Sequence, residues 1–368
     1  MLSAGIVGLP NVGKSTLFNA ITNLRVEASN YPFATIEPNV GIVEVKDKRL
    51  IKLAELIQPE KLIFATFKFV DIAGLVKGAS KGEGLGNKFL SNIREVDCIC
   101  HVIRCFESSS ITHVNNEVNP INDLNTINTE LIIADLEVIE NRIAKISKKA
   151  QSGDKNAIDE LDFCRLLQTT LNKNVFVSEI NKTEKQVEYV KSYNLLTNKP
   201  VIYIANIAEE YIKNPNESKH FLSLKEHLLS KNNANIIIPI SAKIEAELSE
   251  LNETDKQEMM KALNFENGSG LDQIIQKSYQ VLNQCTYFTF GKKETRAWTF
   301  LKGYKAPQCA GIIHSDFERG FIKAEIISVD DLLKYGSEIK AKEAGKIHLE
   351  GKDYVMQDGD VCNFRFNV

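Results

Sequence analysis

The sequence is poor in cysteine and lacks any long apolar run. Its 368 residues include seven scattered cysteines, none in a C-x-x-C pair, which argues against a disulfide framework and for a reducing compartment. No stretch of eighteen apolar residues is present, which argues against a transmembrane helix. The first nine residues carry no basic segment and run directly into a glycine motif, which argues against a signal peptide.

Excess charge of one sign is also missing. The formal net charge of -3 argues against a protein that coats nucleic acid through bulk positive charge, although a local basic patch stays open. With 43% hydrophobic and 25% charged residues, the chain can form a sizeable core and remain soluble. A chain of this length is expected to form two or three domains. We therefore expect a cytoplasmic globular protein that needs neither a membrane nor specific DNA.

Short apolar strands separated by helical stretches run along most of the chain. This pattern predicts an α/β sheet with helices on both faces. The expected strands are 2–7, 40–45, 67–71, 98–105, 201–205 and 236–240. The expected helices include 14–23 and 271–283. We assign residues 1–126 and 199–283 to this domain.

Residues 127–198 interrupt the pattern and predict an inserted antiparallel helical hairpin. Its first helix carries a heptad seam with the spacing 4, 3, 4, 3, at Ile132, Leu136, Ile139, Ile143 and Ile146. After a polar turn, the second helical stretch carries Ile158, Leu161, Cys164 and Leu171. Two ordinary surface helices are the alternative, because two heptads are few.

The pattern of apolar segments and turns changes again near residue 284. From there to residue 368, short strands alternate with turns rich in Gly, Pro and Asp. The expected strands are 297–300, 322–327 and 361–366. This pattern predicts a small separate β-rich domain.

The segment from Gly8 to Ser15, GLPNVGKS, fits the phosphate-binding pattern GxxxxGK[ST]. It lies between an expected strand and an expected helix, as this P-loop motif requires. The glycines let backbone N–H groups surround a phosphate, and the helix N-terminus adds its positive dipole. Lys14 is expected to reach the β- and γ-phosphates, and the Ser15 hydroxyl to bind Mg²⁺.

A second motif, Asp71-Ile72-Ala73-Gly74, follows the strand 67–71 as the DxxG of a switch GTPase follows its third strand. Its Asp71 is expected to hold Mg²⁺ through water, and the Gly74 N–H to contact the γ-phosphate. Thr35 lies between the two motifs in sequence and suits a switch threonine that closes onto Mg²⁺. Ser15, Thr35 and Asp71 are therefore the predicted metal site.

The expected base-binding residues favour adenine over guanine. Asn206-Ile207-Ala208-Glu209 stands where regulatory GTPases carry NKxD, whose Asp accepts two N–H groups from guanine. Glu209 is one methylene longer and Ile207 lacks the lysine stem, so a guanine clamp would be misplaced. Ser241-Ala242-Lys243 matches the remaining base-contact loop.

The water-orienting glutamine of Ras-like enzymes is replaced by Leu75. Hydrolysis is therefore expected to be slow, or another residue must position the water. His113 is the best candidate, because it lies in a loop after the strand 98–105, and such loops surround the ligand in α/β sheets. We interpret His101 as a core residue, and likewise the cysteines of that strand.

Taken together, GLPNVGKST, YPFATIEPNVG, DIAGLVKGASKGEGLGN and the NxxE motif resemble the YchF family of Obg-related ATPases. These belong to the TRAFAC-class P-loop NTPases with an OBG-type G domain. The C-terminal segments RAWTF, KAPQCAGIIHSDFERGFIKAE and GDVCNFRFNV are similar to the family's TGS domain, a β-grasp module. The resemblance covers essentially the whole chain, and it identifies the inserted hairpin with the family's coiled-coil domain.

The resemblance implies an ATP hydrolase that depends on Mg²⁺, prefers ATP to GTP and associates with the ribosome, with the large subunit as the expected contact. It implies a catalytic role for His113 beside Lys14, and it places Asn206 and Ile207 near adenine. Asn11 resembles an asparagine that binds K⁺ in related NTPases, so potassium stimulation stays open. The expected ATP-binding residues are Asn11, Val12, Gly13, Lys14, Ser15, Thr16, Gly74, Asn206, Ile207, Glu209, Ser241, Ala242 and Lys243.

Two basic groups are candidate ribosome contacts. The hairpin carries Arg142, Lys145, Lys148, Lys149 and Lys155, with Asp154 as the nearby acid. The C-terminal domain carries Lys292, Lys293, Arg296, Lys302 and Lys305. Two other functions remain open: a nucleotide-sensing ribosome-binding module with negligible hydrolysis, and an ordinary GTPase.

Overall fold

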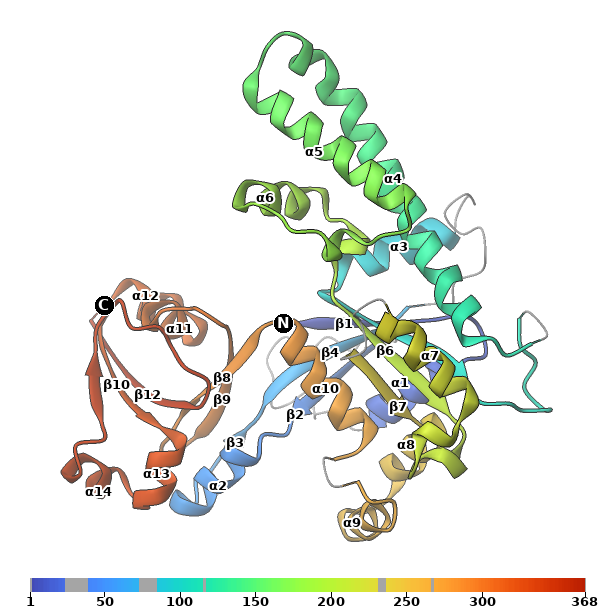
Figure 1. Ribbon diagram of the computed structural model, residues 1–368. Coiled ribbons are helices and arrows are strands. Elements are labelled where there is room, and N and C mark those ends of the chain that lie inside the picture. The colour runs from blue at the N-terminus through green and yellow to red at the C-terminus, as the bar shows by residue number, and fades with distance from the viewer. Residues whose placement is uncertain are drawn as a thin grey trace. The chain divides into compact units, whose positions relative to one another are not determined.

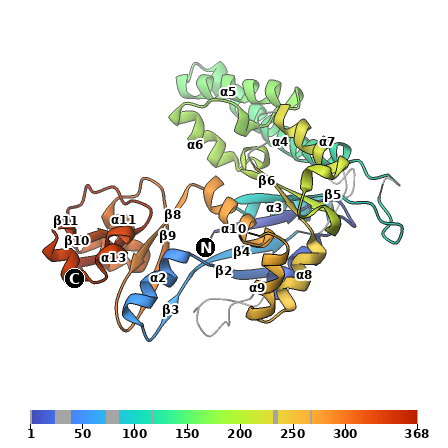
Figure 2. The same cartoon turned by 60° about the horizontal axis from the view of Figure 1, so that its bottom comes forward.

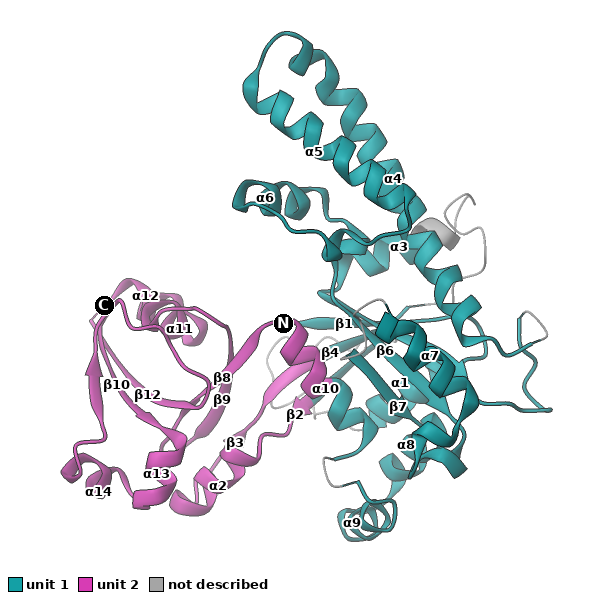
Figure 3. Ribbon diagram, viewed as in Figure 1, with its two compact units in different colours: residues 1–43, 68–274 teal, residues 44–67, 275–368 magenta. Residues whose placement is uncertain are grey.

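The computed structural model describes residues 2–23, 39–72, 85–114, 117–230, 236–265 and 268–367. The chain forms two compact units, shown in Figure 3. The first comprises residues 1–43 and 68–274, and the second comprises residues 44–67 and 275–368. The expected C-terminal domain lies inside the second unit, which also takes in residues 44–67 from early in the chain. Within the described part of the chain, no helix is long and apolar enough to cross a membrane.

The first unit is built on a six-stranded sheet with the order β2-β4-β1-β5-β6-β7 (Figure 1). Parallel pairing joins β4, β1, β5, β6 and β7 in that order. The strands are β1 (Ser3–Val7), β2 (Val40–Val45), β4 (Ala65–Asp71), β5 (Cys98–Cys105), β6 (Val201–Ile207) and β7 (Ile237–Ile240). Every residue of the central strand β5 is buried, because helices cover both faces of a parallel sheet.

The helices around this sheet are α1 (Lys14–Asn23), α3 (Leu85–Glu95), α4 (Pro120–Gln151), α7 (Lys219–Ser230), α8 (Ala242–Glu250), α9 (Glu253–Ala262) and α10 (Gly270–Val281). The two with expected bounds, 14–23 and 271–283, correspond to α1 and α10. Figure 2 shows α4 and α7 on one side of the sheet and α8 on the other. The P-loop lies between β1 and α1, and the loop after β5 leads into α4. The carboxyl ends of the parallel strands therefore carry most of the expected site residues.

The predicted hairpin is present and consists of α4 and α5 (Lys155–Asn172), which pack side by side along their length (Figure 1). Asn119 and Asp154 cap the two helices, each accepting a backbone N–H in the first turn. Of the expected seam, Ile132, Ile139 and Ile146 are buried in α4. Of the apolar residues noted on the second helix, Leu161, Cys164 and Leu171 are buried in α5, whereas Ile158 is 40% exposed and its neighbour Ala157 is buried.

The base of the hairpin is held by a buried carboxylate. Asp135 of α4 is fully buried and accepts hydrogen bonds from the backbone N–H groups of Leu196 and Thr197, at 2.9 and 2.8 Å. The Thr197 hydroxyl donates a third, at 2.7 Å. The returning segment also contains η2 (Val177–Glu179), α6 (Glu184–Tyr193) and η3 (Leu196–Asn198). Three hydrogen bonds offset the cost of burying the Asp135 charge and fix where the hairpin leaves the α/β domain.

The second unit has its own six-stranded sheet, with the order β11-β10-β12-β8-β9-β3. Its strands are β3 (Leu62–Ile63), β8 (Gln284–Thr289), β9 (Thr295–Leu301), β10 (Phe321–Ser328), β11 (His348–Glu350) and β12 (Asp360–Phe366). Its helices are α2 (Lys48–Ile57), α11 (Ala306–Ile313), α12 (Ser315–Arg319), α13 (Val329–Tyr335) and α14 (Glu338–Glu343). The expected strands 297–300, 322–327 and 361–366 therefore correspond to β9, β10 and β12, each slightly longer than expected.

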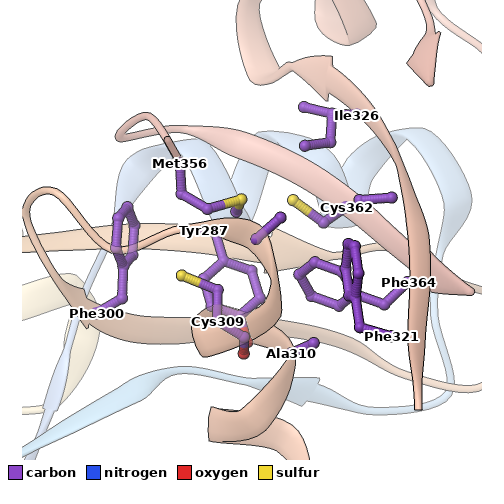
Figure 4. Packing of buried hydrophobic residues seen from close by; sticks show 11 residues of the cluster. Tyr287, Phe300, Cys309, Ala310, Phe321, Ile326, Met356, Cys362 and Phe364 are labelled. Atoms are coloured by element: carbon purple, nitrogen blue, oxygen red, sulfur yellow. The ribbon is translucent and has the colours of Figure 1, made fainter. Parts of the chain in front are cut away.

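Two hydrophobic clusters form the core of this second unit. One is centred on Tyr287, whose ring packs against Phe300 and Phe364 and whose hydroxyl donates to the Cys309 carbonyl at 2.9 Å (Figure 4). The other joins Leu50 and Leu53 of α2 to residues of β8 and β9. The second cluster explains why residues 44–67 belong to this unit: an apolar helix face finds its burial there.

Two short turns of 3₁₀ helix complete the first unit, η4 (Glu209–Tyr211) and η5 (Pro215–Glu217). The strand β6 extends two residues past its expected end at Ala205. Asn206 and Ile207 are therefore held by the sheet, where Asn206 is paired with Arg104 on one side and Ile240 on the other. The base motif begins on a rigid strand and ends in a turn.

Candidate functional site

The P-loop backbone adopts a conformation that requires glycine at two positions, Gly8 and Gly13. Gly13 has a φ of +97°, and a Cβ there would lie 2.3 Å from the side-chain nitrogen of Asn206. A Cβ on Gly8 would lie 2.5 Å from the Val102 carbonyl oxygen. Asn11 also has a positive φ, 62°, which asparagine tolerates better than most residues. Glycines at both ends therefore let the loop wrap closely around a phosphate.

Lys14 is the first residue of α1, where the loop ends, and is 7% exposed. Its Nζ donates to the Leu9 carbonyl at 2.6 Å. Burial lowers the pKa of Lys14 to about 8, and the nearby charge of Asp71 partly offsets that effect. Burial likewise raises the pKa of Asp71, against the influence of Lys14. A lysine held this way has much to gain from an anionic ligand, because a phosphate would restore the stability of its charged form.

Asp71 has the features of a metal-site residue. Its Oδ1 is buried and accepts no hydrogen bond from any residue that the structure describes. Mg²⁺ prefers carboxylate, hydroxyl and water oxygens, so an unsatisfied carboxylate oxygen at the end of β4 fits that ion. Ser15 is exposed at the first turn of α1. The third expected ligand, Thr35, lies outside the described residues, as do Gly74 and Leu75. No cluster of three or more His, Cys, Asp or Glu residues suited to a metal occurs among the described residues.

A cavity of about 610 Å³ opens beside the P-loop, a size that suits a small ligand such as a nucleotide. Its walls come from the P-loop, the end of β6, the start of α8 and the loop after β5. The expected ATP-binding residues that line it are Asn11, Gly13, Lys14, Ser15, Thr16, Asn206, Ile207, Glu209, Ser241, Ala242 and Lys243. Val12 does not line the cavity and is buried beneath it. Residues that are more than two hundred positions apart in the sequence thus line the same cavity.

Asn206 acts as a brace between two of these walls. Its side-chain nitrogen donates to the Val12 carbonyl at 2.9 Å, and its side-chain oxygen accepts from the Ala242 N–H at 3.0 Å. The side chain is buried, and both polar atoms are used. Asn206 therefore positions the P-loop against the start of α8, and its side-chain nitrogen keeps a second hydrogen that these two bonds do not use.

The open end of the cavity carries an ion pair. Lys243 Nζ lies 2.7 Å from a carboxylate oxygen of Glu209, with side chains 66% and 46% exposed. Ile207 lines the cavity but is otherwise buried in the core behind β6. Ser241 caps α8 by accepting from the Ile244 N–H at 3.5 Å. One oxygen of the carboxylate that would have to receive the two donors of guanine is therefore paired with Lys243.

The loop after β5 forms a wall that motif analysis missed. Five of its residues line the cavity: Phe106, Glu107, Ser108, Ser110 and Ile111. Arg104, fully buried at the end of β5, donates from Nε to the Phe106 carbonyl and from Nη2 to the Ile111 carbonyl, both at 3.0 Å. The rule that ligands bind at the carboxyl ends of parallel strands also predicts these loop residues, although in the sequence it pointed only to His113.

His113 does not line the cavity. Its Nε2 lies 2.9 Å from Oδ2 of Asp123, in the first turn of α4, and the two side chains are 3% and 2% exposed. One residue earlier, the Thr112 carbonyl accepts from the Asn11 side-chain nitrogen at 3.1 Å. His101 is buried in β5 as expected, and burial lowers its pKa to about 3, so it stays neutral. The cysteines of that strand are also buried.

Three features together define the class of protein, a P-loop NTPase of the GTPase type. They are a P-loop with a buried lysine, an aspartate at the end of the neighbouring parallel strand, and a cavity large enough for a nucleotide. A family model described as "50S ribosome-binding GTPase" matches residues 3–135. The model of the YchF GTPase C-terminal family, described only as a protein of unknown function, matches residues 284–367.

Relatives match over the full length. The "Ribosome-binding ATPase YchF" of Bacillus subtilis is 54% identical over 367 residues, covering 100% of both chains. That of Mycoplasma genitalium is 55% identical over 368 residues, again covering 100% of both. A solved structure titled "Structure of the Schizosaccharomyces pombe YchF GTPase" has a TM-score of 0.89 at 39% identity, covering 99% of this chain and 97% of that one. The chain belongs to the YchF family, as its motifs indicated.

Proposed function

We propose that this protein is a Mg²⁺-dependent ATPase that binds the ribosome and hydrolyses ATP slowly, as a nucleotide-dependent switch in the cytoplasm. The observation that carries the proposal is the cavity in which a P-loop and an NxxE base motif meet. Curated relatives at more than half identity are named ribosome-binding ATPases, and the yeast structure is titled a GTPase. The choice between ATP and GTP is therefore the first point to test.

In the proposed complex, Lys14 leaves the Leu9 carbonyl and contacts the β- and γ-phosphates. The backbone N–H groups around Gly13 surround the phosphates, as the positive φ of that glycine allows. Ser15, Thr35 and Asp71 would hold Mg²⁺, which supplies positive charge against the phosphate oxygens. Asn11 already donates its side-chain nitrogen to Thr112, so only its amide oxygen would serve a K⁺ ion.

The preference for ATP rests on the pair formed by Glu209 and Lys243. Guanine would need the Glu209 carboxylate as acceptor, and Lys243 competes for it by pairing with one of its oxygens. Exposed ion pairs contribute only about 0–1 kcal/mol, so this pair alone would favour ATP by no more than about fivefold. Calorimetric titration with ATP and GTP tests the idea, and equal or tighter binding of GTP would make the protein a GTPase.

His113 is the proposed catalytic residue, orienting water in place of the glutamine that Leu75 replaces. The substitution His113→Ala should leave ATP affinity nearly unchanged and slow turnover, because the residue acts on the transition state. His101→Ala, at a buried position of β5, is the control for general loss of stability. Single-turnover hydrolysis, with and without ribosomes, is the measurement. Turnover equal to that of the parent protein would remove His113 from the mechanism.

The hairpin is the proposed ribosome contact. Arg142 pairs with Glu160 and Lys149 pairs with Asp154. The three remaining cations are exposed and form no ion pair among the described residues: Lys145, Lys148 and Lys155. Exposed lysines at a helix end suit phosphate contacts, with affinity that falls as salt rises.

The second unit also leaves three of its five candidate cations, Lys292, Lys293 and Lys302, without an ion pair among the described residues. Arg296 lies over the Trp298 ring at 4.0 Å, and Lys305 pairs with Asp353 at 2.8 Å. Co-sedimentation with ribosomes and with isolated large subunits, at low and high salt, tests both groups. Replacing the three hairpin lysines by glutamate should weaken pelleting without altering ATP affinity, and replacing Lys292, Lys293 and Lys302 is the matched comparison. Pelleting as strong as that of the parent would exclude the hairpin.

A nucleotide-sensing module with negligible hydrolysis is the second candidate function. The placement of His113 away from the cavity favours it, because the candidate catalytic group does not face the ligand. A single-turnover rate that ribosomes do not raise above that of the His113→Ala variant would favour the module over the enzyme.

A further inference from the structure

His113 is held inside the protein, although its loop reaches the nucleotide cavity. Five of the residues from Phe106 to Ile111 line the cavity, and the Thr112 carbonyl is hydrogen-bonded to Asn11 of the P-loop. The chain then turns inward, and His113 pairs with Asp123 at 2.9 Å. Both side chains are almost completely buried. A group that is to act on the γ-phosphate must therefore first leave Asp123.

Asp123 and Arg104 form an incomplete pair in the same buried region. Oδ1 of Asp123 and Nη1 of Arg104 are both buried, and neither has a hydrogen-bond partner among the described residues. Burial raises the pKa of Asp123, and the nearby charges of His113 and Arg104 oppose that effect. An unused acceptor and an unused donor of opposite charge are thus close enough to influence each other without being bonded. Unsatisfied buried groups of this kind are rare in native proteins.

We propose that Asp123 is a positioning residue that holds His113 away from the nucleotide, and that Arg104 becomes the partner of Asp123 when His113 leaves. The inference rests on the proposed catalytic role of His113. It adds a resting state, an exchange of partners and two residues that control how often His113 is available.

The exchange is balanced because an ion pair with Arg104 replaces the hydrogen bond between Asp123 and His113. A buried carboxylate that lost His113 without compensation would be strongly disfavoured. Arg104 can supply that compensation with Nη1 while Nε and Nη2 keep the carbonyls of Phe106 and Ile111. The cavity wall formed by residues 106–111 can therefore keep its shape while His113 moves. Asn11 links this loop to the P-loop, so phosphate binding and His113 release share one connection.

The first experiment measures whether Asp123 shields His113, independently of catalysis. The nucleotide-free protein is treated with diethyl pyrocarbonate, and the modification of each histidine is followed by peptide mass spectrometry. His113 should react slowly in the parent and at least about fivefold faster in Asp123→Ala. The matched control is Asp135→Asn, which changes another buried carboxylate of α4 that does not touch His113. Equal His113 reactivity in Asp123→Ala and the parent would overturn the shielding, and His101 should stay protected in all folded variants.

The second experiment measures turnover. If Asp123 restrains His113, Asp123→Ala and the better-tolerated Asp123→Asn should raise kcat by several-fold to about tenfold with little change in KM, because the competent fraction rises. Adding His113→Ala should abolish the gain. A fall in kcat would mean that Asp123 orients His113 for catalysis, which overturns the restraint. Asp135→Asn should not raise kcat.

Arg104 is tested by non-additivity. Arg104→Met removes the hydrogen bonds to the Phe106 and Ile111 carbonyls in both backgrounds, but it should lower kcat by several-fold more in the parent than in Asp123→Ala, because no carboxylate then needs a new partner. Equal effects in both backgrounds would reduce Arg104 to a support for the loop. Should His113→Ala alone leave turnover unchanged, the proposed catalytic role fails, while the reactivity of His113 still decides whether Asp123 shields it.

Discussion

Because the pKa of Lys14 is lowered, the affinity for nucleotide should fall as the pH rises. Burial lowers the pKa of this lysine from 10.5 to about 8 in the free protein. Phosphate binding favours the charged form, so the bound state retains its proton. With a pKa of about 8, roughly nine-tenths of the free protein carries the charge at pH 7 and roughly one-tenth at pH 9. Affinity for Mg²⁺-ATP should therefore fall about tenfold between these values, about 1.4 kcal/mol.

The same lysine should affect the stability of the free protein in the opposite direction. Between pH 8 and pH 10.5 the unfolded chain keeps the proton that folded Lys14 has lost, so the free energy of unfolding rises with pH. The whole change corresponds to about 3 kcal/mol at 1.36 kcal/mol per pKa unit. Below pH 8 both states hold the proton, and the contribution of Lys14 no longer changes.

Titration with a fluorescent ATP analogue at constant Mg²⁺, at pH 7, 8 and 9, measures the affinity. Urea unfolding of the nucleotide-free protein over pH 7 to 10 measures the stability. Lys14→Met is the control in both, because it should bind weakly with little pH dependence and should lack the rise in stability. ATP affinities that agree within twofold at pH 7 and pH 9 would refute the reasoning, since they would mean that Lys14 stays charged in the free protein.

Four further substitutions test the architecture of the site and the hairpin. Gly13→Ala should weaken ATP binding more than tenfold by calorimetry, because its Cβ would collide with Asn206 at 2.3 Å in a backbone conformation of φ +97°. Asp135→Ala should lower the free energy of unfolding by about 3 kcal/mol in urea, because three buried donors lose their acceptor. Ile207→Lys should lower the free energy of unfolding by about 3 kcal/mol or more, because it places a charge in the core. Glu209→Asp, at an exposed position, should lower it by less than about 0.5 kcal/mol. Thermal or urea unfolding measures both.

At Ile207, the comparison of motifs and the structure lead to different expectations. By analogy with NKxD, restoring a lysine at this position would rebuild a guanine clamp. The side chain of Ile207 instead packs with Ile103, Cys105 and Leu124 behind the sheet. A lysine there would lose stability before it could cover a base. Nucleotide preference is therefore better altered at Glu209 and Lys243, which are exposed.

Local signals in the sequence determined the G-domain elements closely. The helix Lys14–Asn23 and the strands Val40–Val45 and Cys98–Cys105 have the same bounds in the structure as in the expectation. Glycines, apolar runs and the P-loop spacing act over a few residues, so neighbouring positions suffice to predict them. The same locality predicted that Lys14, Ser15 and the residues around Glu209 and Lys243 would line one cavity, because they follow the carboxyl ends of parallel strands.

Only the tertiary structure decided which distant side chains became partners. Asn206 joins Val12 to Ala242, and residues 44–67 complete a core formed mostly by residues beyond 275. Ile158 is one of the apolar residues of the second hairpin helix, yet it is 40% exposed, because the packing of one helix against the other decides which of its apolar residues are buried. The pairing of His113 with Asp123 was equally beyond sequence reasoning. Both residues carry chemistry that suits a nucleotide site, and burial against each other, a property of the folded chain alone, directs them away from it.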